Sequence, residues 1–148
     1  MYLTLSVDVE APAERLWYEL ADIEAHGSWM RDAARITITS ERRLGAGTTA
    51  EVVTRLGPVR TTDVMRVTVW DPPRLMGVRH EGTVTGAGLF RIEPRDPGRC
   101  RFTWEEELTF PWFLGGPLGE RLARPFLLFK WRANLRRLAA QACAATGR

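Results

Sequence analysis

The segment RFTWEEELTFP, residues 101–111, carries the pattern that decides the fold. Its alternate positions hold Phe102, Trp104, Glu106, Leu108 and Phe110, and the positions between them hold charged or hydroxylated side chains. A period of two is typical of a β-strand that buries one face. We therefore predict a strand over Arg101–Phe110 whose buried face is mainly aromatic and includes one carboxylate, that of Glu106.

Further strands are predicted on the N-terminal side of this segment, between short turn motifs. DPP at residues 71–73 and DPG at residues 96–98 are turn sequences, because proline cannot donate a hydrogen bond within a central strand. Short connections between consecutive strands favour antiparallel pairing. The full set of predicted strands is Leu3–Val9, a strand through Ile36 and Ile38, Thr49–Arg55, Arg60–Trp70, Leu75–Glu81, Thr83–Glu93 and Arg101–Phe110.

Helices are predicted at both ends of the chain. Pro12 suits the first turn of a short helix with Leu16 and Leu20 on its apolar side, and a second helical turn covers Ile23–His26. Leu118–Ala145 is rich in Leu, Ala and Arg, which predicts one long helix. The predicted fold class is therefore α+β, with a seven-stranded antiparallel sheet, two short helices and a long C-terminal helix.

The long helix carries two apolar stripes, although a helix with a single packing partner needs only one. One stripe consists of Leu128, Trp131, Leu135, Leu138 and Ala142. The other lies nearly opposite and consists of Leu118, Leu122, Phe126, Phe129 and Ala133. Two interpretations stay open: Pro125 kinks or restarts the helix between its halves, or the second stripe meets another surface.

The order of these elements and four sequence stretches resemble a known family. The stretches are VDVEAPAERLWYELADIEAHGSWM at 7–30, DPPRL at 71–75, FRIEP at 90–94 and RFTWEEELTFP at 101–111. Over essentially its whole length the chain resembles the START-like (SRPBCC) superfamily, and within it the polyketide cyclase/dehydrase and lipid-transport group. The resemblance implies a single helix-grip domain over residues 1–148, with a curved sheet gripping the terminal helix around an apolar cavity. It also implies an apolar small-molecule ligand.

Strand alternation selects the side chains expected to face that cavity. On Arg60–Trp70 the inner face is assigned Asp63, Met65, Val67 and Val69, and the outer face Thr62, Val64, Arg66, Thr68 and Trp70. The rims are expected to carry His26, Trp29 and Met30 on one side and Trp112 and Phe113 on the other. The complete set of predicted ligand contacts is Trp29, Met65, Val67, Val78, His80, Phe90, Phe102, Trp104, Glu106, Leu108, Arg124, Leu128 and Trp131.

Glu106 and His80 are the candidate acid–base residues. A buried carboxylate is costly unless it is paired, protonated or hydrated, so Glu106 either lies at a wet cavity mouth or anchors a ligand. His80 alternates with Met76 and Val78 and is expected to point inward, as a titratable ligand contact or as a structural residue. Arg124 is hypothesised to pair with Glu106 or a ligand carboxylate, the alternative being a solvated position at a kinked helix end.

Composition and missing motifs argue against several classes of function. The net charge is +3, from 21 basic and 18 acidic residues, which is too weak a bias to indicate nucleic-acid binding. No apolar run approaches the ~20 residues that cross a bilayer and no signal-peptide pattern is present, so we expect a cytoplasmic protein. Cys100, Cys143 and two histidines form no disulfide framework or zinc motif, so neither a metal nor another cofactor is expected.

Three functional hypotheses remain. The first is a binding or carrier protein for an apolar, lipid-like or polyketide-like aromatic molecule. The second is a polyketide cyclase or dehydratase that uses Glu106 and His80 as acid and base. The third is an interaction module that forms a homodimer or docks through Leu122, Phe126 and Phe129. Titratable groups that converge in a closed cavity would favour the enzyme. An apolar cavity without such groups would favour the carrier. A collapsed cavity with an exposed aromatic stripe would favour the interaction module.

Overall fold

A computed structural model describes residues 1–146 of the chain, so two residues of the predicted domain range lie outside the described part. It contains one seven-stranded antiparallel sheet in the order β1-β7-β6-β5-β4-β3-β2. The strands are β1 (Tyr2–Val9), β2 (Ala33–Ile38), β3 (Thr49–Leu56), β4 (Val59–Asp71), β5 (Leu75–Glu81), β6 (Thr85–Pro94) and β7 (Cys100–Thr109). The predicted strands are thus confirmed, and the predicted ends agree with the observed ones or differ by one or two residues.

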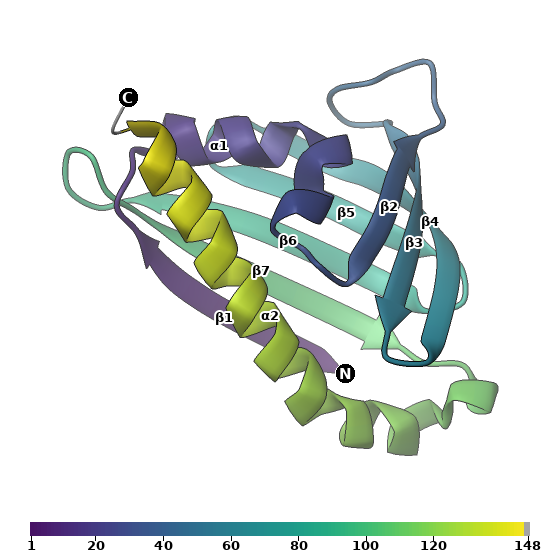
Figure 1. Ribbon diagram of the computed structural model, residues 1–148. Helices are drawn as coiled ribbons and strands as arrows, with labels where there is room; N and C mark the ends of the chain where they lie inside the picture. The colour runs from purple at the N-terminus through teal and green to yellow at the C-terminus, as the bar shows by residue number, and fades with distance from the viewer. Residues whose placement is uncertain (147–148) are drawn as a thin grey trace.

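The helices lie on one face of the curved sheet (Figure 1). They are α1 (Ala13–Ala21), the 3₁₀ helices η1 (Ile23–Ser28) and η2 (Trp112–Leu114), and the long C-terminal helix α2 (Gly116–Thr146). Figure 1 shows α2 crossing the sheet diagonally, with its C-terminal end beside α1. This arrangement confirms the predicted α+β helix-grip fold. The second short helix continues through Gly27 instead of ending there.

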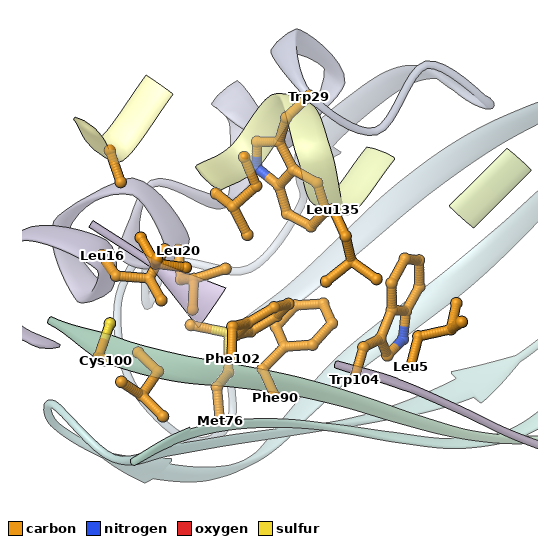
Figure 2. Close-up of a cluster of buried hydrophobic side chains, with 14 of the residues drawn as sticks. Leu5, Leu16, Leu20, Trp29, Met76, Phe90, Cys100, Phe102, Trp104 and Leu135 are labelled. Atoms are coloured by element: carbon orange, nitrogen blue, oxygen red, sulfur yellow. The ribbon is translucent and has the colours of Figure 1, made fainter. Parts of the chain in front are cut away.

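The closed end of the fold is a tightly packed core between the sheet, α1 and α2. Figure 2 shows Leu16 and Leu20 of α1 above Phe102 of β7, with Leu135 of α2 beside them. These four side chains are at most 2% exposed. Apolar burial of this kind contributes roughly 25 cal/mol per Å² to folding, and here it fixes α1 and the C-terminal half of α2 on the sheet.

A β-bulge in β4 overturns part of the predicted face assignment. The register with β5 shifts between Val67 and Val69, so that Trp70 pairs with Met76. Trp70 therefore lies on the inner face and packs against Trp17 of α1, with ring centroids 5.2 Å apart in an edge-on arrangement. Placing Val69 inside and Trp70 outside was wrong, because an extra residue in a bulge reverses the alternation that follows it.

Helix α2 runs without interruption through Pro125, so the alternative in which the helix restarts there is wrong. Figure 1 shows that the green N-terminal part of α2 bends relative to the yellow part. A proline inside a helix removes one backbone hydrogen bond and crowds the preceding turn, which accounts for a bend. The bent N-terminal part borders the open end of the fold.

No helix in residues 1–146 is long and apolar enough to cross a membrane.

Candidate functional site

A cavity of about 540 Å³ lies between the concave face of the sheet, η1 and the N-terminal half of α2. Its volume is within the range of small-molecule sites in proteins. The wall is largely aliphatic and aromatic, from Ile23 of η1 and Ile36 of β2 through the central strands to Leu122 and Leu127 of α2. The cavity lies where the sequence analysis expects an apolar pocket, between the sheet and the terminal helix.

Strand register shows how the cavity is layered from its closed end to its mouth. Three rows of paired residues cross β5, β6 and β7 in turn: Met76, Phe90 and Trp104; then Val78, Gly88 and Glu106; then His80, Gly86 and Leu108. The first row adjoins the core, and the third lies towards Phe110 and Leu114 at the open end. Glu106 is therefore at mid-depth, and His80 lies one row nearer the open end.

The aromatic rings of Trp104 and Trp131 hold α2 above the sheet at the inner end of the cavity. Their centroids are 4.4 Å apart and their planes are within 17° of parallel. Both side chains are buried and both line the cavity. The stack therefore sets the separation of helix and sheet at the point where the packed core gives way to open volume.

Glu106 has two protein partners inside the cavity. His80 Nε2 contacts its Oε1, and Trp104 Nε1 donates a hydrogen bond of 2.7 Å to its Oε2. The Glu106 side chain is only 4% exposed, whereas that of His80 is 25% exposed. Glu106 is thus a paired buried carboxylate, and the interpretation in which it is simply solvated at the mouth is wrong.

Two glycines in β6 make the contact between His80 and Glu106 sterically feasible. His80 is on β5 and Glu106 is on β7, so β6 runs between them. The β6 residues that face them are Gly86 and Gly88. A Cβ atom at Gly88 would overlap the Glu106 carboxylate. Any larger residue at Gly88 would separate the pair.

Opposing effects set the charge state of His80. Burial lowers the pKa of its imidazole. The hydrogen bond and negative charge of Glu106, with a smaller contribution from the charge of Asp63, raise the pKa by more than burial lowers it. The net effect is a pKa above the ordinary value of 6.5. Since Nε2 is held by Glu106, the protonated ring has its second N–H, on Nδ1, for another acceptor.

His26 is a second histidine of the cavity wall, with the opposite behaviour. Its side chain is 2% exposed, and Nε2 donates a hydrogen bond of 2.7 Å to the Leu20 carbonyl oxygen. Burial lowers its pKa to about 4, against the raising effects of that hydrogen bond and of Asp22. Because Nε2 carries the proton, Nδ1 of the neutral ring is an acceptor. The cavity wall thus includes one histidine with a lowered pKa, His26, and one with a raised pKa, His80.

A polar cluster fastens α2 to the segment between η1 and β2 beside the cavity. Asn134 Nδ2 donates a hydrogen bond of 2.6 Å to Asp32 Oδ1, and Trp131 Nε1 donates one of 3.3 Å to Asp32 Oδ2. Arg137 donates to the Asn134 side-chain oxygen and to the Trp29 carbonyl oxygen. Sequence reasoning missed this cluster, although a buried Asn on the apolar stripe of α2 was a signal for it.

Most of the predicted ligand contacts do line the cavity, although their contact with a ligand remains a prediction. The lining members of the predicted set are Met65, Val78, His80, Phe90, Trp104, Glu106, Leu108 and Trp131. Trp29, Val67 and Phe102 are instead buried in the core, and Leu128 is half-buried away from the cavity. Leu127 takes the lining position in place of Leu128, whereas Trp131, Leu135, Leu138 and Ala142 of the predicted stripe are buried as expected.

The proposed pairing of Arg124 with Glu106 is wrong. Arg124 is exposed and donates a hydrogen bond to the Tyr2 carbonyl oxygen, while both Glu106 oxygens are occupied by other partners. Of the predicted rim residues, His26 and Met30 line the cavity, Trp29 is fully buried, and Trp112 and Phe113 are exposed and do not line the cavity. Within residues 1–146, no three His, Cys, Asp or Glu side chains group so that they could hold a metal ion.

The family model for polyketide cyclase/dehydrase and lipid transport matches residues 2–142. The chain belongs to this family. An uncharacterised protein of Mycobacterium tuberculosis is 34% identical over 139 residues, which cover 90% of this chain and 79% of that protein.

Solved structures of other proteins show the same fold. The Zhui aromatase/cyclase from a Streptomyces species superposes with a TM-score of 0.79 at 18% identity, over 96% of this chain and 93% of that one. A START superfamily protein from Mycobacterium smegmatis gives a TM-score of 0.73 at 17% identity, over 95% and 98%. At these identities the likeness establishes the fold alone.

The geometry of the His80 site predicts that Gly88→Ala lowers the pKa of His80. The new methyl group displaces the Glu106 carboxylate, and burial then outweighs the remaining attraction. Glu106→Gln should act in the same direction, whereas Ala87→Ser, on the outer face of β6, should leave the His80 pKa unchanged. The measurement is an NMR titration of the imidazole resonances. An unchanged His80 pKa in Glu106→Gln would contradict the assigned cause.

The buried state of His26 predicts a loss of stability in mild acid. Its pKa is about 4 in the folded chain and near 6.5 when unfolded, so unfolding binds a proton between these values. Stability from this group is present above pH 6.5 and decreases as pH falls towards 4, by on the order of 3 kcal/mol. The free energy of unfolding is measured with urea for the parent and for His26→Gln, above pH 6.5 and near pH 4. The difference in pH dependence between the two proteins gives the contribution of His26. Equal pH dependence in the two proteins would refute it.

Proposed function

We propose that the chain binds and carries an apolar small molecule that has one hydrogen-bonding oxygen, with the His80–Glu106 pair as the polar anchor. The observation that carries the proposal is a largely apolar cavity of about 540 Å³ whose wall contains the directly contacting pair His80–Glu106. Membership in the polyketide cyclase/dehydrase and lipid transport family supports a small-molecule role.

The cavity wall supplies affinity and the histidine supplies orientation. Burial of an apolar ligand among side chains such as Met65, Val78 and Phe90 contributes through the hydrophobic effect. His80, held by Glu106 through Nε2, would present Nδ1–H to a carbonyl, carboxylate or phenol oxygen of the ligand. The two partners of Glu106 keep its carboxylate fixed, so the anchor is preorganised before the ligand enters.

Filling the cavity should weaken binding of an apolar probe. Met65 of β4 lines the cavity, and Thr62 is exposed on the same strand. We expect Met65→Trp to weaken binding of the neutral fluorophore N-phenyl-1-naphthylamine by about tenfold or more, while Thr62→Trp leaves it unchanged. Fluorescence titration gives the affinities, and native mass spectrometry followed by organic extraction reports any molecule that co-purifies. Equal binding by the two variants would contradict ligand carriage in this cavity.

A cyclase or dehydratase activity is the second candidate, because His80 and Glu106 converge within the cavity. In an aldol cyclisation, protonated His80 would give a proton to the carbonyl oxygen as the new carbon–carbon bond forms. The attacking carbon loses its proton to water, so the addition is balanced. We rank this second because the protein already occupies both Glu106 oxygens and one nitrogen of His80, which leaves a single donor.

The enzyme hypothesis predicts faster cyclisation of a simple diketone. Heptane-2,6-dione can close to a six-membered ring by an internal aldol reaction, and loss of water then gives an enone that is followed by its ultraviolet absorbance. If His80 is the acid, the parent protein should accelerate the reaction by at least about tenfold over His80→Gln. Equal rates for the parent and the variant, with the apolar probe still bound by both, would remove the enzyme hypothesis and leave carriage intact.

A further inference from the structure

Six large apolar side chains are exposed on η2 and the N-terminal half of α2, which borders the cavity, and we call them the apolar rim. They are Trp112, Phe113, Leu118, Leu122, Phe126 and Phe129. Their exposed fractions lie between 44% for Phe126 and 87% for Trp112. Exposed apolar groups are common singly, but a continuous set of this size is typical of a contact surface.

Helix geometry explains why the rim is one surface. Leu118, Leu122 and Phe129 are spaced by four and seven residues, so they lie on one side of α2. The buried stripe, which includes Trp131 and Leu138, lies on the opposite side. The outer side of a surface helix is ordinarily polar, and here it is apolar over its first four turns. Packing within the chain therefore does not account for these side chains.

The charges of α2 have one predominant sign. The basic residues of the helix are Arg121, Arg124, Lys130, Arg132, Arg136 and Arg137, and its only acidic residue is Glu120. Glu120 is itself engaged by the Met1 ammonium group and the Phe110 amide. In residues 1–146 no side-chain ion pair involves the basic residues of α2. Arg137 belongs to the polar cluster around Asp32, and the other basic residues present positive charge on the helix that carries the apolar rim.

We propose that the apolar rim and the basic residues of α2 dock on the surface of an anionic lipid bilayer. Tryptophan and phenylalanine side chains insert at the boundary between headgroups and acyl chains. Arginine and lysine side chains that extend from the same helix reach lipid phosphates. The exposed aromatic side chains therefore match the acyl-chain boundary of such a surface, and the basic side chains match its phosphate groups.

Charge also argues against a second copy of the chain as the occupant. In a symmetric dimer through this face, the two α2 helices would bring identical sets of cations together. Like charges that approach in this way oppose association, while an anionic surface is attracted over about a Debye length. A negatively charged lipid surface is therefore favoured over self-association.

The docked orientation would place the cavity entrance at the bilayer. Leu122 and Phe126 belong to the rim and also line the cavity. Val59 in the hairpin between β3 and β4 lines the same cavity and is 44% exposed. A molecule could then pass between the acyl layer and the cavity without crossing bulk water. Binding to the surface does not depend on the proposed carriage, so the two can be tested separately.

The test is co-sedimentation with vesicles of phosphatidylcholine alone or mixed with about one-third phosphatidylglycerol. We expect binding to the anionic vesicles at low salt, at least about tenfold weaker binding to neutral vesicles, and marked weakening at high salt. The double variant Trp112→Ala/Phe113→Ala and the charge reversal Lys130→Glu/Arg132→Glu should each reduce binding about tenfold or more.

Matched controls use exposed residues away from the rim. Tyr18→Ala removes an aromatic side chain that is 70% exposed on α1, and Arg79→Glu reverses an exposed charge on the outer face of the sheet. Both should bind vesicles like the parent. Absence of binding to anionic vesicles, or equal loss in the rim and control variants, would overturn the proposal. A dimer seen by light scattering that Trp112→Ala/Phe113→Ala dissolves, without vesicle binding, would also overturn it and assign the rim to self-association.

Discussion

The stack of Trp131 on Trp104 is the contact on which the rest of the site depends. With centroids 4.4 Å apart, these rings hold α2 at one height above β7. On one side of the stack, side chains such as Phe102 and Leu138 fill the space completely. On the other side α2 bends away at Pro125 and the space stays open. The cavity is therefore a consequence of where the close packing between helix and sheet ends.

Trp104 also links this packing to the chemistry of the cavity. Its ring stacks on α2, and its Nε1 donates to Glu106, which in turn holds His80. A buried carboxylate without such partners would be strongly unfavourable, so the three side chains have to be arranged together. The glycines at 86 and 88 complete the arrangement, because they leave the space through which β5 and β7 interact across β6.

The two halves of α2 differ in how they are held to the rest of the domain. The C-terminal half is fixed by core packing and by hydrogen bonds of Asn134 and Arg137 to the segment around Asp32. In the N-terminal half, Glu120 and Arg124 bind backbone groups of Phe110 and Tyr2, and most of the large apolar side chains line the cavity or are exposed. This asymmetry places the polar anchor, the cavity mouth and the apolar rim in sequence from the interior to the surface.

The sequence by itself determined the elements, the antiparallel pairing of consecutive strands and the inward direction of Glu106, His80 and Trp104. Alternation along a strand depends only on local geometry. The sequence could not locate the bulge that turns Trp70 inward, since a bulge is defined by the pairing of β4 with β5. Nor could it find the partner of Glu106. Arg124 was favoured by spacing along one helix, while His80 reaches Glu106 only because the curved sheet brings β5 and β7 together over two glycines. The tertiary structure alone decided which polar groups meet, because distances between strands that are not sequence neighbours arise from packing of the whole domain.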